Sequence, residues 1–132
     1  MIFLEQKLSG VYLIEPTPFT DERGTFRRHF CDKEFEAHNI ATKVYQSNVS
    51  ENRYTYTLRG FHYQVPPHGE GKTLSCLRGS IFDIVVDMRP KSPTYMKWIS
   101  VEINENNRYS IHVPVGCANA FLTMEDNCLI HY

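Results

Sequence analysis

The densest group of residues able to do chemistry lies between Leu58 and Gln64, where the sequence is Leu-Arg-Gly-Phe-His-Tyr-Gln. His62 is a candidate general base, because an imidazole titrates close to neutral pH. If this segment is a strand, Leu58, His62 and Gln64 point to one face and Arg59 points to the other. A single histidine on a strand is more often structural than catalytic, so a catalytic His62 needs supporting groups nearby.

Lys72 is the first such group. It begins a predicted strand after the loop 66–71, which has the sequence Pro-Pro-His-Gly-Glu-Gly. Such a loop is flexible enough for the ammonium group to reach the same cavity as His62. The other histidines have no partner at ligand spacing, and we expect them at the surface or in ordinary packing: His29, His38, His68, His112 and His131.

The turn 114–116 and Asn119 follow the pattern Pro-x-Gly-x-x-Asn, which resembles the second motif of cupin jelly rolls. The region of His62, Gln64 and Glu70 resembles a degenerate first cupin motif. One imidazole, two amides and one carboxylate form a weak ligand set for a transition metal. We therefore predict a jelly roll with no metal and no cofactor.

Short strands separated by turns must position these groups. Their spacing of roughly 8–12 residues, without alternating helices, predicts an all-β sandwich or barrel with about nine strands and at most one or two short helices. Only Asp32–His38 looks helical, with Asp32 as N-cap and Phe35 as its apolar anchor. The predicted strands are 11–14, 25–30, 44–49, 58–64, 72–77, 81–88, 97–103, 108–113 and 118–124.

The segment 81–88 has the strict two-residue alternation of a strand. One face carries only apolar residues. The other face carries Asp83 and Asp87 beside Ile81 and Val85, so it is expected to meet either solvent or a polar cavity. If it meets a cavity, Asp83 is a candidate carboxylate partner for His62.

Length and charge exclude several classes of protein. With 132 residues, 14 Lys+Arg and 15 Asp+Glu, the chain is expected to form one domain, residues 1–132, without the basic field of a nucleic-acid-binding protein. No apolar run approaches the ~20 residues of a membrane span, and no signal peptide is evident. The four scattered cysteines are expected to be buried, reduced thiols, which favours a cytoplasmic location.

Several motifs in one order resemble the dTDP-4-dehydrorhamnose 3,5-epimerase family, whose fold is a cupin jelly roll. They cover the chain from about residue 11 to residue 132. The matching segments are Asp21-x-Arg23-Gly24-x-Phe26, Gln46-x-Asn48, Arg59-Gly60-Phe61-His62-Tyr63-Gln64, Asp83-Ile84-Val85-Val86-Asp87-Met88-Arg89 and Ser92-Pro93-Thr94.

The resemblance implies epimerisation of a nucleotide-linked 4-keto-6-deoxy sugar at C3, C5 or both. His62 matches the base that removes the proton next to the ketone. Lys72 matches the cation that stabilises the enolate oxygen, and Tyr132 matches the acid that returns a proton to the opposite face. Such a division of roles suits an epimerase, which needs a base and an acid on opposite sides of one carbon.

The resemblance also implies a binding site for a nucleotide diphosphate sugar and a homodimer with exchanged N-terminal strands. Two aromatics match residues that pack on the base, partly from the neighbouring subunit: Phe19 and Phe26. The positions that match contacts to the diphosphate or the sugar are Arg23, Gln46, Asn48, Arg59 and Asn119.

Three departures from the family pattern bear on substrate and activity. Arg28 stands where the family has a glutamate, and Asn119 stands where it has a histidine. Family members also continue beyond the tyrosine that Tyr132 matches, into a C-terminal extension whose aspartate orients the catalytic histidine. We expect this chain to lack that extension, and we expect Tyr132 to fray as a terminal residue.

The leading hypothesis is therefore an epimerase of the dTDP-4-dehydro-6-deoxyglucose type. Two alternatives stay open. One is a jelly roll that binds nucleotide sugars without turnover, and the other is an epimerase for a different nucleotide-linked 4-keto sugar, such as a heptose.

Overall fold

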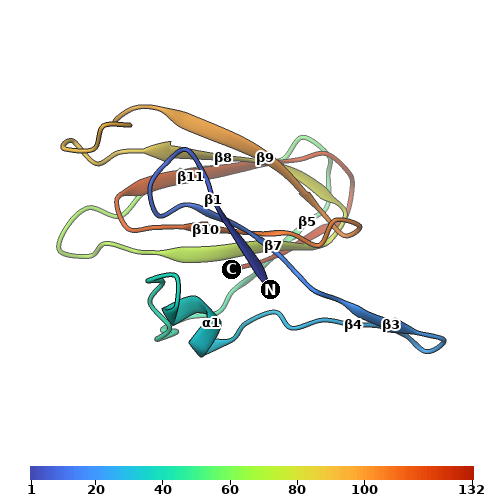
Figure 1. Ribbon diagram of the computed structural model, residues 1–132. Helices are drawn as coiled ribbons and strands as arrows, with labels where there is room; N and C mark the ends of the chain where they lie inside the picture. The colour runs from blue at the N-terminus through green and yellow to red at the C-terminus, as the bar shows by residue number, and fades with distance from the viewer.

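The computed structural model describes all residues from 1 to 132 and is almost entirely β-structure (Figure 1). It contains twelve strands and one short helix, α1 (Asp32–Glu36). The strands are β1 (Ile2–Glu5), β2 (Tyr12–Glu15), β3 (Phe19–Asp21), β4 (Gly24–Phe26), β5 (Val49–Asn52), β6 (Leu58–His62), β7 (Lys72–Arg78), β8 (Ser80–Asp87), β9 (Trp98–Asn104), β10 (Ser110–Val113), β11 (Cys117–Thr123) and β12 (Cys128–His131).

Two antiparallel sheets face each other and form the body of the molecule. One has six strands in the order β1-β2-β10-β7-β12-β5, and the other has four in the order β6-β11-β8-β9. The hairpin β3–β4 forms a separate two-stranded sheet that projects away from the body (Figure 1). The all-β prediction is confirmed, although the structure has twelve strands where about nine were expected.

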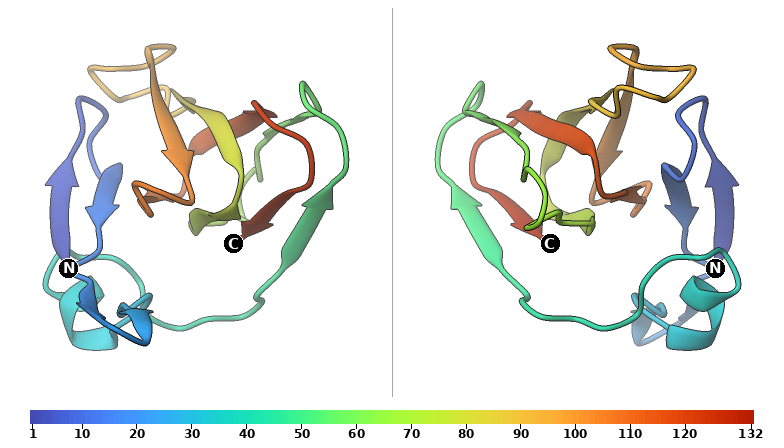
Figure 2. Two further views of the ribbon diagram at one scale, coloured as in Figure 1. Left: turned by 90° about the vertical axis from the view of Figure 1, so that its right-hand side faces the viewer. Right: turned by 90° about the vertical axis from the view of Figure 1, so that its left-hand side faces the viewer.

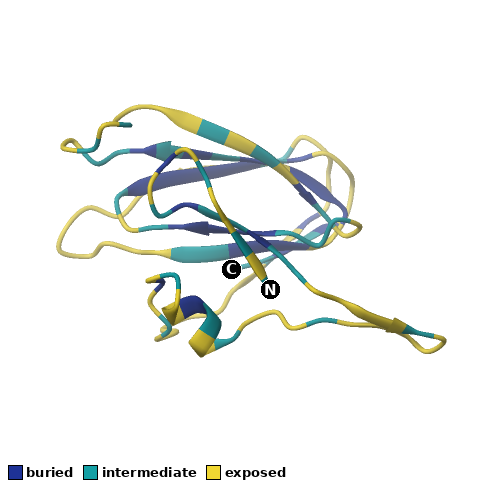
Figure 3. Ribbon diagram, in the orientation of Figure 1, coloured by how far each residue is buried: buried dark blue, intermediate teal, exposed yellow.

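The hydrophobic core fills the space between the two sheets, where the strands are coloured as buried in Figure 3. Leu74 of β7 and Ile111 of β10 come from the larger sheet, while Ile81 and Val85 of β8 come from the smaller one. Each such side chain contributes roughly 1.5–3 kcal/mol by leaving water. The core therefore holds the two sheets face to face and fixes the gap between them.

The acidic face of β8 is turned into this gap. Ile81, Asp83, Val85 and Asp87 are all buried, whereas Phe82 on the apolar face is partly exposed. The sequence allowed either solvent or a polar cavity around these carboxylates, and their burial excludes solvent. A buried carboxylate needs hydrogen-bond donors, and both aspartates have them.

Asp87 shows how such a carboxylate is satisfied. Arg89 donates to its Oδ1 at 2.8 Å and to its Oδ2 at 2.9 Å, and the hydroxyls of Ser92 and Thr94 both donate to Oδ2 at 2.6 Å. Burial opposes the charge, but these hydrogen bonds hold the pKa of Asp87 below its usual value. This cluster ties the end of β8 to the following turn.

Several predicted element boundaries are wrong. The segment 44–49 is irregular up to its last residue, because most of it crosses beneath the body from α1 to β5 (Figure 2), and only Asn48 and Val49 at its end pair with the C-terminal residues 131–132. The predicted strand 25–30 ends at Phe26. The helix ends at Glu36. Its N-cap is Cys31, not Asp32 as predicted, and the Asp32 carboxylate accepts a hydrogen bond from the Lys33 amide inside the first turn.

Two histidines expected to be isolated are in contact. Nε2 of His29 lies 3.1 Å from Nδ1 of His131, and Oγ of Ser47 lies 2.9 Å from Nε2 of His131. These contacts hold the segment after the β3–β4 hairpin against β12. The pairing could not be read from the sequence, because His29 and His131 lie 102 positions apart.

Candidate active site

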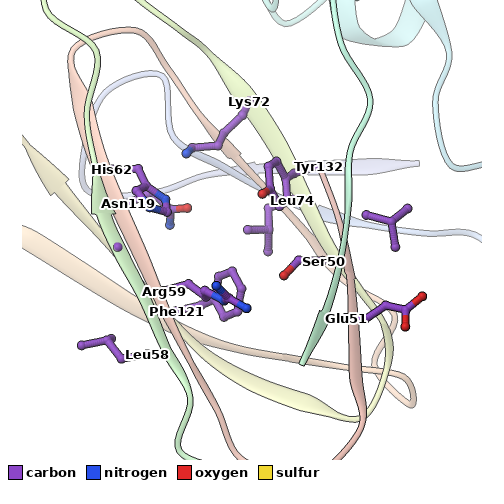
Figure 4. Close-up of a pocket in the computed structure, with 12 residues that line it drawn as sticks. Ser50, Glu51, Leu58, Arg59, His62, Lys72, Leu74, Asn119, Phe121 and Tyr132 are labelled. Carbon is purple, nitrogen blue, oxygen red and sulfur yellow. The ribbon is translucent and has the colours of Figure 1, made fainter. Parts of the chain in front are cut away.

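A cavity of about 560 Å³ opens between the two sheets. It is bounded by β5 and β7 of the larger sheet, by β6 and β11 of the smaller one, and by Tyr132. Figure 4 shows the residues that line it. They are Val49, Ser50, Glu51, Leu58, Arg59, Gly60, His62, Lys72, Leu74, Asn119, Phe121 and Tyr132.

His62 and Arg59 both line this cavity, although simple alternation places them on opposite faces. In the pairing of β6 with β11, His62 lies opposite Asn119 and Arg59 lies opposite Phe121. Three steps along β6 therefore match two steps along β11, as in a β-bulge, which changes the face on which the following side chains emerge. The expectation that Arg59 and His62 point apart is wrong for this reason.

Gly60, between these two residues, allows the close approach of β6 to β11. Its φ is +118°, a conformation that side-chain-bearing residues rarely adopt. A Cβ atom at this position would lie 2.7 Å from Cα of Ala120. Any other residue at position 60 would push β6 away from β11 and move both pocket residues.

The Arg59 side chain is oriented by a buried amide. Its Nε donates to Oδ1 of Asn52 at 3.0 Å, and the Asn52 amide nitrogen donates to the Ser50 carbonyl at 3.2 Å. Nε is thus occupied, which leaves the terminal nitrogens of the guanidinium group for a ligand. Asn52 is a residue that the sequence analysis missed, because a lone asparagine between strands has no distinguishing pattern.

Lys72 stands at the beginning of β7 with its side chain only 14% exposed. Its Nζ lies 3.8 Å from Oε1 of Glu70, a long contact to a side chain that is about half exposed. The ammonium group also acts on buried Asp83, whose pKa it lowers. Lys72 therefore brings a partly desolvated positive charge to the cavity.

Asp83 lies beneath the cavity floor and is covered by Asn119. The amide nitrogen of Asn119 donates to both carboxylate oxygens at 3.0 Å. Burial raises the pKa of Asp83 to about 7, while the Asn119 hydrogen bond and the charge of Lys72 lower it. No hydrogen bond joins Asp83 to His62, so the structure does not support Asp83 as the carboxylate partner of that histidine.

Tyr132 is held by its own main chain. Its N–H donates to the Asn48 carbonyl at 3.0 Å, and the Asn48 N–H donates to the Tyr132 carbonyl at 2.7 Å. These bonds continue the ladder in which His131 pairs with Val49. The expectation that Tyr132 frays is wrong, and Asn48 acts here through its backbone.

Five of the predicted binding residues do not line the cavity of this chain, and Asn48, which pairs with Tyr132 through its backbone, is one of them. Arg23 lies at the tip of the β3–β4 hairpin, where it pairs with Asp21. Phe19 and Phe26 of the same hairpin are 66% and 75% exposed. Gln46 lies exposed in the segment between α1 and β5.

The cavity thus brings together a histidine, a lysine and a tyrosine. His62 and Asn119 lie on one side of it, Tyr132 lies on the other, and Lys72 lies between them at one end (Figure 4). This arrangement can remove a proton from a bound molecule on one side, stabilise negative charge on an oxygen, and return a proton from the other side. Arg59 adds a fork suited to phosphate or carboxylate oxygens.

Comparison with known protein families gives an extensive match. A family model described as dTDP-4-dehydrorhamnose 3,5-epimerase matches residues 5–132. A protein of this name from Sinorhizobium fredii is 38% identical over 132 residues, which are all of this chain and 68% of that protein.

Solved structures give the same result. The dTDP-4-dehydrorhamnose 3,5-epimerase of Bacillus anthracis, with TDP and PPi bound, has a TM-score of 0.95 at 30% identity over 98% of this chain and 74% of that one. The dTDP-6-deoxy-D-glucose-3,5-epimerase of Legionella pneumophila, in complex with dTDP-4-keto-L-rhamnose, has a TM-score of 0.92 at 31% identity over 98% and 69% of the two chains. These similarities confirm the predicted cupin jelly roll.

The one helix of the structure, α1, is neither long enough nor apolar enough to cross a membrane.

Proposed function

The chain belongs to the dTDP-4-dehydrorhamnose 3,5-epimerase family, and we propose that it is an isomerase of a dTDP-linked 4-keto-6-deoxy sugar, acting at C3, C5 or both without a cofactor. The family relationship extends over nearly the whole chain. The Bacillus and Legionella relatives bind TDP and a dTDP-keto sugar, respectively, in the same fold. The reaction belongs to the biosynthesis of deoxysugars.

In the proposed mechanism His62 removes the proton from a carbon next to the ketone. The C–H electron pair moves into the ring and leaves an enolate whose negative charge rests on the former ketone oxygen. Lys72 stabilises this charge with its partly desolvated ammonium group. Tyr132 then donates its phenolic proton to the opposite face of the carbon, which inverts the configuration and restores the ketone.

One observation carries this proposal. His62, Lys72 and Tyr132 come from β6, β7 and the end of β12, far apart in the sequence, yet they line one cavity. His62 and Tyr132 lie on its opposite sides (Figure 4). A base and an acid facing each other across a substrate pocket is the arrangement that epimerisation requires.

We assign the diphosphate of the substrate to Arg59, because its fork is held toward the cavity by Asn52 and binds phosphate oxygens in a bidentate way. Asn119 is assigned to the sugar. Arg23, Phe19, Phe26 and Gln46 do not line the cavity of their own chain, so we assign the three hairpin residues to the nucleotide bound by a second copy.

The working unit in this proposal is a homodimer with exchanged N-terminal strands. The β3–β4 hairpin projects from the body (Figure 1) and carries two exposed phenylalanines. Exposed aromatics on a projecting hairpin favour burial against a partner. We also propose a cytoplasmic location, which agrees with four free cysteines.

The test is hydrogen exchange in heavy water. The protein is incubated with dTDP-4-keto-6-deoxyglucose, and deuterium at C3 and C5 is followed by NMR. Deuterium at both carbons, with inversion, identifies a 3,5-epimerase, and deuterium at one carbon identifies a monoepimerase. Measurable binding of dTDP without any exchange would overturn the proposal in favour of a protein that only binds nucleotide sugars.

The matched variants are His62→Asn and His68→Asn. His62→Asn removes the base and should lower exchange by 10²-fold or more. His68, in the exposed loop between β6 and β7, is the control and should leave exchange unchanged. Equal exchange in the wild type and His62→Asn would disprove the assignment of the base.

A further inference from the structure

Asn119 forms part of the cavity floor, where it is only 3% exposed. Its amide nitrogen has three neighbours, all of them hydrogen-bond acceptors. They are the two carboxylate oxygens of Asp83, both at 3.0 Å, and the carbonyl oxygen of Ile84 at 3.1 Å. The two N–H groups of the amide are therefore fully used below the floor.

These neighbours fix which way the amide faces. Turning it over would place the carbonyl oxygen of Asn119 against the main-chain carbonyl of Ile84, where two acceptors would meet without a proton between them, and would leave an ionised Asp83 without its donor. Leaving buried polar groups unpaired costs about 1–3 kcal/mol each, and more where one is charged. The amide therefore keeps its nitrogen down and its Oδ1 toward the cavity.

Oδ1 of Asn119 accepts no hydrogen bond from the protein. Every fully buried side-chain polar atom of the structure has a hydrogen-bond partner, so this unpaired oxygen is not fully buried. It is therefore an accessible acceptor in the cavity wall. A carbonyl oxygen cannot donate and does not titrate. A ligand group that meets it must bring its own hydrogen.

We propose that Asn119 determines sugar specificity by presenting this fixed acceptor to the hydroxyl on C3 of the substrate. The assignment rests on the proposed function, in which His62 faces the carbon next to the ketone. Asn119 and His62 are directly opposite in the pairing of β11 with β6, so their Cβ atoms are about 5 Å apart. Of the two carbons that flank the 4-ketone, C3 bears a hydroxyl and C5 bears a methyl group, and only the hydroxyl can donate.

The experiment measures equilibrium binding, so it does not depend on turnover. Isothermal titration calorimetry compares dTDP-6-deoxyglucose with its 3-deoxy, 3-deoxy-3-fluoro and 2-deoxy analogues. One lost hydrogen bond that leaves Asn119 unpaired should weaken binding on the order of ten-fold or more for the 3-deoxy sugar. The 3-fluoro sugar, which accepts but cannot donate, should be weakened as much, and the 2-deoxy sugar should bind like the parent.

Two variants separate the acceptor from the shape of the pocket. Asn119→Leu removes the acceptor and should bind the parent and the 3-deoxy sugar with equal affinity. Asp83→Asn is nearly isosteric and offers both a donor and an acceptor, so it removes the carboxylate that opposes turning over the Asn119 amide, while the Ile84 carbonyl remains. In that variant the 3-fluoro sugar should recover part of its affinity, because an N–H group can then face it.

Equal binding of the parent and the 3-deoxy sugar by the wild type would overturn the proposal, and so would a loss confined to the 2-deoxy sugar. If Asn119→Leu still bound the parent sugar ten-fold more tightly than the 3-deoxy sugar, the proposal would also be overturned. If a variant fails to fold, the series of analogues on the wild type still decides. If the wild type shows no deuterium exchange, the proposed function fails, but the proposal for Asn119 can still be judged from the binding of the analogues.

Discussion

Tyr132 and Asn48 exchange two main-chain hydrogen bonds, one of 2.7 Å and one of 3.0 Å. The phenol that we assign as the proton donor is thus positioned by its backbone and by the strand pairing of β12 with β5. Its hydroxyl takes part in none of the hydrogen bonds inside the protein, so it is free to act on a ligand. Removing the hydroxyl should therefore change the chemistry without moving the ring.

Tyr132→Phe should lower the rate of inversion by 10²- to 10³-fold, because the second face of the carbon loses its acid. Removal of the proton by His62 does not need the phenol, so deuterium should still enter the substrate with retention of configuration. Both quantities are measured by NMR in heavy water. Tyr109→Phe, a tyrosine packed against the core away from the cavity, is the control. If Tyr132→Phe lost both deuterium exchange and inversion, Tyr132 would not be acting as the second acid.

Arg59→Ala should weaken the binding of dTDP about ten- to one hundred-fold, since a charge-assisted bidentate contact to phosphate is lost. Calorimetry at two salt concentrations checks this, and the variant should show a smaller dependence on salt than the wild type. Arg78→Ala is the matched control, because Arg78 is exposed and donates to the Asn127 carbonyl outside the cavity. An unchanged affinity in Arg59→Ala would place the diphosphate elsewhere.

His112 makes the stability of the fold sensitive to acid. Burial lowers the pKa of its imidazole to about 4, while the unfolded chain takes up the proton near pH 6.5. Between these values the unfolded state binds more protons, so the free energy of unfolding falls as the pH falls from about 6.5 to 4. The contribution of this residue is about 3 kcal/mol at full extent.

The variant His112→Gln isolates this contribution. Asp83 acts in the opposite direction, because its raised pKa adds stability as the pH falls below about 7, and only a difference between two proteins cancels it. Urea unfolding at pH 7 and pH 4.5 should show a larger loss for the wild type than for His112→Gln. Parallel losses in the two proteins would contradict the assignment to His112.

The double variant Phe19→Ser/Phe26→Ser should weaken the proposed homodimer. The two phenylalanines are direct partners across the hairpin and present their rings to solvent in the single chain. Light scattering coupled to size-exclusion chromatography should show dimer for the wild type and a shift toward monomer for the variant. Tyr95→Ser removes an exposed aromatic from a turn of the body and serves as the control. A wild type that is monomeric at all concentrations would refute the exchange of strands.

The sequence predicted much of the site because the motifs that carry it are local. His62, Lys72 and Asn119 were assigned from short patterns and Tyr132 from the family resemblance, and the structure places all four around one cavity. The strands that hold His62, Lys72 and Asn119 were also recognisable from alternation and turn residues, whereas β12 was not predicted. These are the features that neighbouring residues determine.

What the sequence could not predict depends on partners distant in the chain. The shared face of Arg59 and His62 follows from a bulge against β11, and the orientation of Arg59 follows from Asn52. The segment 44–49 has the composition of a strand, but only Asn48 and Val49 at its end have a paired neighbour. Alternation in 81–88 correctly separated two faces, but the burial of Asp83 depended on a donor from β11, the amide of Asn119.

The position of β12 in the larger sheet governs when the catalytic apparatus can exist at all. This strand is late in the sequence, yet it lies between β7 and β5 and pairs with both. Until it is inserted, two unpaired strand edges face each other across a gap, which is a common starting point for aggregation. A nascent or partly unfolded chain therefore holds His62 and Lys72 without the phenol that completes them. The proposed site, which needs His62, Lys72 and Tyr132 together, is therefore complete only when β12 is paired within the larger sheet.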